Sequence, residues 1–244
     1  MVELADGQDR TAISDDLTAT RPSVLAVLRK RAEWSRAVES LLKLFATKGD
    51  AARKAAAEYG EVYRGLRGAM VFDVVASRQR RYEPRVLPLV KRWKSDASSP
   101  SLEWLAANPP ETGRYGLRRG EAATMAAVAG NLRRLAVDLG VSEDVACRTW
   151  ADSVDGLEHA PGLDPIVGSV KGIGPALFAY MRMRAGGDAL KADLRVTRGL
   201  RLLGFEVPGG VHATLVIARA VAEEIGTSLL VLDQLLWGLD DRWD

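Results

Sequence analysis

The chain has 244 residues, of which 47% are hydrophobic and 27% charged, and its formal net charge at neutral pH is +2. This composition is typical of a folded globular protein and excludes a fibrous or wholly disordered one. A single cysteine, Cys147, excludes an internal disulfide and a four-cysteine iron–sulfur cluster, and with only two histidines we expect no metal site.

The first 20 residues are acidic, polar and without periodicity, so we predict a disordered tail over 1–20 and a folded region over 21–244. The N-terminus lacks the basic-then-apolar layout of a signal peptide. No run approaches the ~18 apolar residues of a membrane span. We therefore expect a cytoplasmic protein without a membrane partner.

From Ser23 onward, apolar residues recur with helical spacing almost to the end of the chain. Val38, Leu41 and Phe45 share one helix face, and Gly49 predicts the end of that helix. The segment AMVFDVVAS, residues 69–77, is apolar nearly all round and is predicted to be a buried central helix or strand.

The second half of the chain continues the helical pattern. A strong helix-forming run precedes Gly140, which predicts a helix end there, and Ser142 is predicted to cap the next helix. Alternating strands and internal repeats are lacking. The sequence predicts an all-α fold of about ten helices, in one compact or two-lobed body.

The stretch from Lys171 to Phe205 carries most of the chemical information. Asp164 is predicted to cap a short helix that ends at Lys171, and Gly172-Ile173-Gly174 then turns the chain into a second helix. Ile173 is expected to point inward. The backbone N–H groups of such a turn, beside a helix N-terminus, favour an anion such as phosphate, although a glycine pair also serves as a plain connection.

Asp193 stands where another helix begins. As an N-cap residue, it is predicted to accept hydrogen bonds from backbone N–H groups and to stay ionised at neutral pH. Capping alone would explain an isolated aspartate at this position. The glycine turn upstream is what suggests a catalytic role in addition.

Together these segments resemble the helix-hairpin-helix DNA glycosylase superfamily. VKGIG, residues 170–174, is similar to that family's Leu-Pro-Gly-hydrophobic-Gly hairpin, and KADLRVTRGLRLLGF, residues 191–205, is similar to its segment with the catalytic aspartate. GLRRGEAATMAAVA, residues 116–129, and Ser77-Arg78-Gln79 extend the resemblance to about residues 65–205. The implied architecture has a helical core over that range and a second lobe built from both ends of the chain.

The resemblance implies a monomeric enzyme that flips a damaged or modified base out of double-stranded DNA and hydrolyses its N-glycosidic bond. Asp193 would be the catalytic residue. DNA contacts would come from Lys171, Gly172, Ile173, Gly174, Ala176, Gln79 and Arg195. It implies no cofactor, apart from a structural monovalent cation that such hairpins can hold.

The chain departs from the family pattern at several positions. Ala176 stands where strand-cleaving members have a lysine, so we expect no lyase activity, although Lys171 and Lys191 are close enough in sequence to weaken that expectation. Glu121 replaces the usual lysine of the upstream helix, and Leu194-Arg195 replaces Thr-His.

The base pocket is the least defined part of this hypothesis. Its stacking candidates are aromatic residues that could equally be core residues: Tyr115, Trp104, Trp150 and Trp237. Asp73 is a candidate pocket acceptor, but we favour a solvent-facing or capping position for it. A non-catalytic DNA-binding module, or a glycosylase-like protein with another reaction on a modified base, are the alternatives to a glycosylase.

Overall fold

The computed structural model describes residues 23–239, and all regular elements in that range are helical. The predicted tail over 1–20 lies outside the described residues. The α-helices are α1 Val24–Leu28, α2 Ala32–Tyr59, α3 Arg67–Ala76, α4 Leu87–Asp96, α5 Leu102–Ala107, α6 Glu121–Leu139, α7 Glu143–Ser153, α8 Pro175–Arg184, α9 Leu194–Leu202, α10 Val211–Ile225 and α11 Leu229–Trp237. Short 3-10 helices are η1 Glu61–Tyr63, η3 Leu157–His159 and η4 Pro161–Leu163, and η2 Tyr82–Val86 is a π-helical turn.

Helix ends follow the local chemistry of the sequence. Ser142 caps α7 through its hydroxyl, which accepts a hydrogen bond from the Val145 N–H at 3.3 Å, as predicted. Gly140 ends α6 with φ +65°, a left-handed conformation that glycine adopts without steric cost. The all-α prediction is therefore confirmed for the described residues.

Two local predictions are wrong. Helix α2 continues through Gly49, because the glycine is buried where α2 packs against α10 and α11, and this tertiary packing outweighs its low helix propensity. Residues 165–171 form turns and no α-helix. There Asp164 accepts hydrogen bonds from three successive amides, and Gly168 approaches the Pro161 carbonyl too closely for any larger residue.

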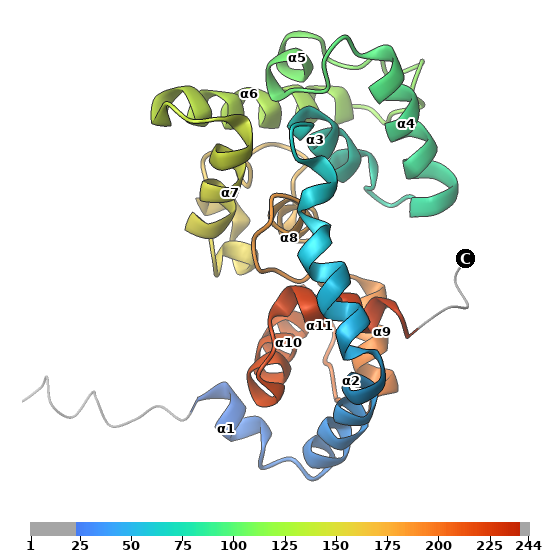
Figure 1. Ribbon diagram of the computed structural model, residues 1–244. Coiled ribbons are helices and arrows are strands. Elements are labelled where there is room, and N and C mark those ends of the chain that lie inside the picture. The colour runs from blue at the N-terminus through green and yellow to red at the C-terminus, as the bar shows by residue number, and fades with distance from the viewer. Residues whose placement is uncertain (1–22, 240–244) are drawn as a thin grey trace, which may run out of the picture.

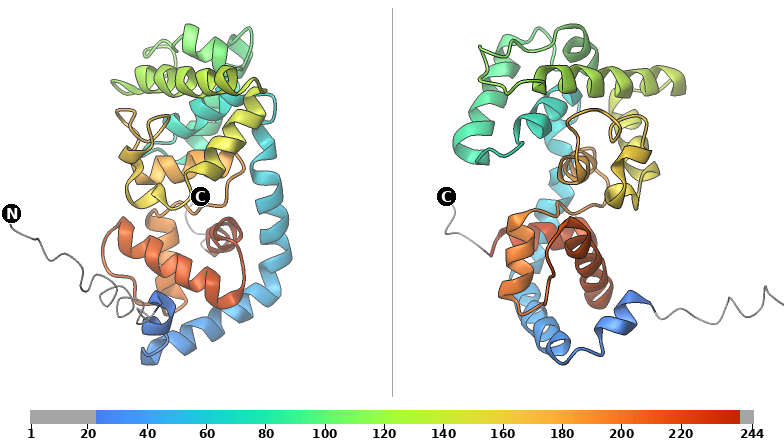
Figure 2. Two further views of the ribbon diagram at one scale, coloured as in Figure 1. Left: turned by 90° about the vertical axis from the view of Figure 1, so that its left-hand side faces the viewer. Right: turned by 180° about the vertical axis from the view of Figure 1, so that it is seen from behind.

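Buried apolar side chains form two large clusters. The first cluster is built from residues between Tyr63 and Ala185, and the second combines residues 25–52 with residues 190–236. Figure 1 shows the corresponding groups of helices, one around α3 and α8 and the other around α9 to α11, with the long helix α2 running from one group to the other. The side view and the rear view in Figure 2 show the same arrangement.

Helix α3 lies at the centre of the first cluster. All ten of its residues are buried, so the apolar segment that could have been helix or strand is a central helix. Helix α8 is buried along most of its length, packs against α3 and α7, and ends in two arginines, Arg182 and Arg184. Helix α8 thus carries charge into the interior, and its two ends organise the candidate site.

Candidate functional site

The glycine turn before α8 has the conformation that its sequence predicts. Gly172 has φ +101°, and Ile173 is buried in the first cluster. A β-carbon on Gly172 would lie 2.8 Å from the hydroxyl oxygen of Thr124, which itself donates a hydrogen bond to the Lys171 carbonyl at 2.8 Å. The backbone conformation and this close approach both require glycine at position 172.

The turn also presents backbone donors. Within residues 23–239, the N–H groups of Gly172, Gly174 and Ala176 have no protein acceptor. Gly172, Gly174 and Ala176 are partly exposed, and Pro175 occupies the first position of α8. These amides, together with the helix dipole, can bind an anion.

Asp193 is the N-cap residue of α9, as predicted. Its Oδ1 atom accepts hydrogen bonds from the amides of Arg195 at 2.9 Å and Val196 at 3.2 Å. Its Oδ2 atom lies 3.9 Å from the Nζ atom of Lys191, and 27% of the side chain is exposed. One carboxylate oxygen is therefore committed to the helix, whereas the other faces an ammonium group and solvent.

Lys191 connects Asp193 to α8. Its Nζ atom lies 4.5 Å from the ring centroid of Tyr180, and its backbone N–H donates to Oδ1 of Asp233 at 3.0 Å. Asp233 is buried in α11, and burial raises the pKa of its carboxyl to about 7. Lys191 is thus held by Tyr180, in the first hydrophobic cluster, and by Asp233, on a helix of the second.

Tyr180, on which the Lys191 ammonium rests, also belongs to a buried group of one carboxylate and three tyrosines. Asp73, on α3, has no exposed surface, and its Oδ2 atom accepts hydrogen bonds from the hydroxyls of Tyr63 at 2.8 Å, Tyr180 at 3.1 Å and Tyr82 at 3.2 Å. Arg184 completes the group with Nε 3.6 Å from the same oxygen. The expectation of a solvent-facing or capping position for Asp73 is wrong, because three tyrosine hydroxyls and Arg184 hold its Oδ2 atom inside the core.

Tyr59 closes the group, which we call the tyrosine cluster: Asp73, Arg184, Tyr59, Tyr63, Tyr82 and Tyr180. The Arg184 guanidinium lies 4.0 Å from the Tyr59 ring centroid, close enough for a cation–π contact. Burial raises the pKa of Asp73, and the guanidinium and the tyrosine hydroxyls partly offset that rise. Oδ1 of Asp73 is buried without a hydrogen-bond partner among the described residues. Sequence analysis missed the cluster; its only signal was one aspartate in an apolar helix.

Gln79 and Arg195, two of the predicted DNA contacts, lie outside the tyrosine cluster. Gln79 is exposed, and it is the one non-glycine residue of the described chain with positive φ, at +51°. Arg118 holds this loop by donating to the Gln79 side-chain oxygen at 2.8 Å and to its carbonyl at 3.1 Å. Arg195 lies over the ring of Trp237, with its guanidinium carbon 4.0 Å from the ring centroid.

The other aromatic candidates pack mainly in the first cluster. Trp150 is fully buried and donates from Nε1 to Asp164 at 3.1 Å, so no face of its ring is open to a base. Tyr115 is 6% exposed and donates to Asp96 at 2.9 Å. Trp104 is partly buried against the same cluster. Trp150, Tyr115 and Trp104 make no hydrogen bond or ring contact with the tyrosine cluster, whereas Tyr82 and Tyr59 belong to it and are partly exposed.

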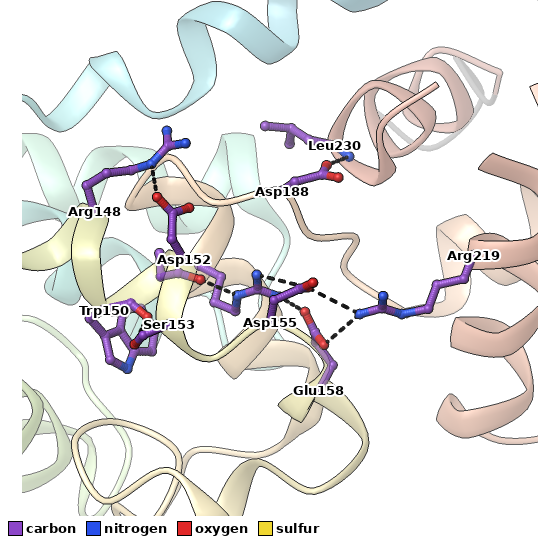
Figure 3. A network of polar contacts seen from close by, with 11 residues as sticks. Arg148, Trp150, Asp152, Ser153, Asp155, Glu158, Asp188, Arg219 and Leu230 are labelled. Atoms are coloured by element: carbon purple, nitrogen blue, oxygen red, sulfur yellow. Dashed lines mark hydrogen bonds and ion pairs between the residues drawn. The ribbon is translucent and has the colours of Figure 1, made fainter. Parts of the chain in front are cut away.

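A second polar network joins α8, η3 and α10 (Figure 3). Arg182 forms ion pairs with Glu158 and Asp155, and Arg219 from α10 reaches Glu158 at 3.1 Å and Asp155 at 3.5 Å. A cleft of about 550 Å³ adjoins it, lined by Asp152, Asp155, Arg182, Asp188, Arg219, Ala222, Glu223, Thr227 and Leu229.

Comparison with known proteins identifies no relative. The chain matches no protein-family model, no curated protein and no solved structure. Among residues 23–239, no three or more acidic, histidine or cysteine side chains are grouped so as to hold a metal ion. Over the same residues, no helix combines the length and hydrophobicity needed to cross a membrane.

Proposed function

We propose that the chain is a DNA glycosylase that flips a damaged or modified base out of duplex DNA and hydrolyses its N-glycosidic bond. The observation that carries the proposal is the presence of two partly exposed groups: the amides of Gly172, Gly174 and Ala176 in the glycine turn, which have no acceptor among the described residues, and the side chain of Asp193. The amides can donate hydrogen bonds to a phosphate, and the carboxylate can stabilise a positive charge. The two hydrophobic clusters are compatible with the two-lobed architecture that this function implies.

The amides of the glycine turn would bind a phosphate beside the flipped nucleotide. Such contacts fix the register of the enzyme on the duplex and read no sequence. A base inside a duplex cannot be reached by a side chain at the protein surface, so extrusion of the nucleotide is part of the reaction. Gln79, which Arg118 holds in an exposed loop, would occupy the gap left in the stack.

Asp193 would act as the base departs. Positive charge grows on the deoxyribose in that step, and a carboxylate fixed beside it lowers the barrier without having to reorganise. Its Oδ1 atom is already held by two backbone amides, which leaves Oδ2 for the sugar or for an attacking water. Ala176, which replaces the lysine of strand-cleaving members, leaves strand cleavage outside the proposal.

The test is a panel of duplexes that carry alkylated, deaminated or oxidised bases, each incubated with the protein and then treated with hot alkali. Strand breaks that appear only after alkali indicate base release without lyase activity. Asp193→Asn is the matched variant, because asparagine preserves the shape and can still cap α9. We expect it to bind DNA normally and to lose base release by at least about 100-fold.

A non-catalytic DNA-binding module is the competing function. It is favoured by the capping bonds of Asp193, which explain that residue without catalysis. Tight binding to every duplex of the panel with no release of any base would select this alternative. Full activity of Asp193→Asn would instead show that the catalytic assignment is wrong.

A further inference from the structure

We infer that Lys191 is a positioning residue, which holds the free carboxylate oxygen of Asp193 at a fixed distance from the glycine turn that precedes α8. This inference rests on the proposed function, since it concerns how that site is held together. Lys191 is named by neither the capping pattern nor the hairpin motif. Its role follows from what each part of it contacts.

Two hydrogen bonds hold the backbone of Lys191. Its N–H donates to Oδ1 of Asp233 at 3.0 Å, and its carbonyl accepts a hydrogen bond from the Asp193 N–H at 2.7 Å. A tight turn therefore joins Lys191 to Asp193, and the buried α11 anchors that turn. Asp188, earlier in the same connection, is also tied to α11, through a hydrogen bond from the Leu230 N–H at 2.8 Å.

The side chain of Lys191 then bridges to α8. Its ammonium lies over the ring of Tyr180, 4.5 Å from the centroid, and 3.9 Å from Oδ2 of Asp193. With 21% of its side chain exposed, Lys191 is held more firmly than a surface lysine. The ammonium thus occupies the space between the aromatic face and the carboxylate.

Tyr180 cannot turn away from this contact. Its hydroxyl donates to Asp73 at 3.1 Å and accepts from Nε and Nη2 of Arg184 at 3.1 and 3.0 Å. The tyrosine cluster thereby fixes the ring plane on which the ammonium rests. A buried hydrogen-bonded network restricts the side chains that it joins, so the cluster has a positioning role in addition to its contribution to stability, even though Oδ1 of Asp73 has no partner among the described residues.

The chain of contacts has a functional consequence. Tyr180 belongs to α8, the helix that follows the glycine turn, and Asp193 caps α9. The link Tyr180–Lys191–Asp193 therefore sets the separation between the proposed phosphate grip and the proposed catalytic carboxylate. In a site of this kind, small displacements of a reacting group cost large factors in rate.

The experiment uses two DNA probes and needs no knowledge of the natural lesion. One duplex carries a tetrahydrofuran, a neutral abasic analogue, and the other carries a pyrrolidine whose protonated ring nitrogen stands at the position of C1′. The quantity measured is the ratio of the two dissociation constants, tetrahydrofuran over pyrrolidine, from fluorescence anisotropy at one ionic strength. For the wild type we expect a ratio of about 10 or more, since a fixed carboxylate favours the cation.

Lys191→Met separates positioning from simple charge. Removing a competing ammonium should raise the ratio if charge alone matters, whereas loss of positioning should lower it, and we expect a fall to about 2 or less. Lys191→Arg keeps a cation that can rest on Tyr180 and should restore most of the ratio. Lys54→Met, an exposed lysine of α2, is the matched control and should leave the ratio unchanged.

The outcomes distinguish this inference from the function on which it rests. A ratio that rises or stays constant in Lys191→Met, with wild-type preference and base release intact, overturns the role of Lys191 and leaves the glycosylase proposal standing. A wild-type ratio near unity, without base release from any duplex of the panel, overturns both. Thermal melting of each variant excludes unfolding as the cause of a lowered ratio.

Discussion

Helix α8 carries two buried arginines, Arg182 and Arg184, two residues apart, and their surroundings differ in one instructive way. Arg184 is ion-paired with a single carboxylate, Asp73, which has no exposed surface and accepts its hydrogen bonds from neutral tyrosine hydroxyls. Arg182 shares its charge with Glu158 and Asp155, and a second arginine, Arg219, contacts the same two carboxylates (Figure 3).

The difference is one of redundancy. Removal of Arg184 leaves Asp73 without a cation, because no other arginine or lysine is paired with it among the described residues. Removal of Arg182 leaves Glu158 paired with Arg219, and leaves Asp155 largely exposed to water, with 62% of its side chain accessible. A buried charge tolerates the loss of one partner only where a second partner or water replaces it.

The largest expected effect is that of Arg184→Met. It strands the Asp73 carboxylate in the core, and we expect the free energy of unfolding to fall by about 3–5 kcal/mol. Urea denaturation of the purified variant measures this loss. The double variant Arg184→Met/Asp73→Asn is the control: it removes the stranded charge as well and should regain part of the stability. A loss below about 1 kcal/mol in the single variant would contradict the assigned role of this pair.

Arg182→Met should cost less, about 1–3 kcal/mol, through the lost bond to the Ala151 carbonyl and the weakened pairing of Glu158. The same urea experiment applies. If Arg219 compensates, then Arg182→Met and Arg219→Met together should destabilise the protein by more than the sum of the two single changes. Strict additivity would show that the second arginine offers no compensation.

The contrast between the two arginines also shows what a sequence can and cannot predict. The caps at Ser142 and Asp193 and the turn at Gly172 depend on residues within a few positions of one another, so local chemistry was enough to predict them. Asp73 finds its partners 9, 10 and 107 residues away, and no local pattern announces that Tyr180 will reach it.

The dependence on long-range contacts also explains the wrong predictions. Glycine has a low helix propensity, yet packing keeps α2 intact at Gly49. The ring of Trp150 could stack on a base, yet it is buried in the core. From the sequence, Lys191 is only an amine close to the glycine turn. Its contacts with Tyr180 and Asp233 depend on how α8 and α11 meet, which a single sequence does not display.

A histidine pair beside the Arg182 network provides the last test. Nδ1 of His159, at the end of η3, lies 3.0 Å from Nδ1 of His212, on α10, with the ring planes 9° apart and the centroids separated by 5.3 Å. The centroid separation exceeds the nitrogen separation by about two ring radii, so the rings meet edge to edge in one plane. Such a hydrogen bond requires one neutral ring as acceptor.

Protonation should weaken this contact. Burial, together with His212 and Arg219, lowers the pKa of His159 below its usual 6.5, whereas Glu158 and Asp155 are already committed to arginines nearby. The unfolded chain therefore binds the proton first, and the contribution of His159 is present above about pH 6.5 and lost as the pH falls below it. The pair is partly exposed, so water screens the effect and we expect less than about 1 kcal/mol.

Asp233 acts in the opposite direction, because its raised pKa of about 7 makes the fold more stable as the pH falls. The informative quantity is thus the stability of the wild type minus that of His159→Gln, measured by urea denaturation between about pH 7.5 and 5.5. This difference should decline toward the acidic end, and a constant difference would show that the histidine pair contributes nothing to the pH dependence.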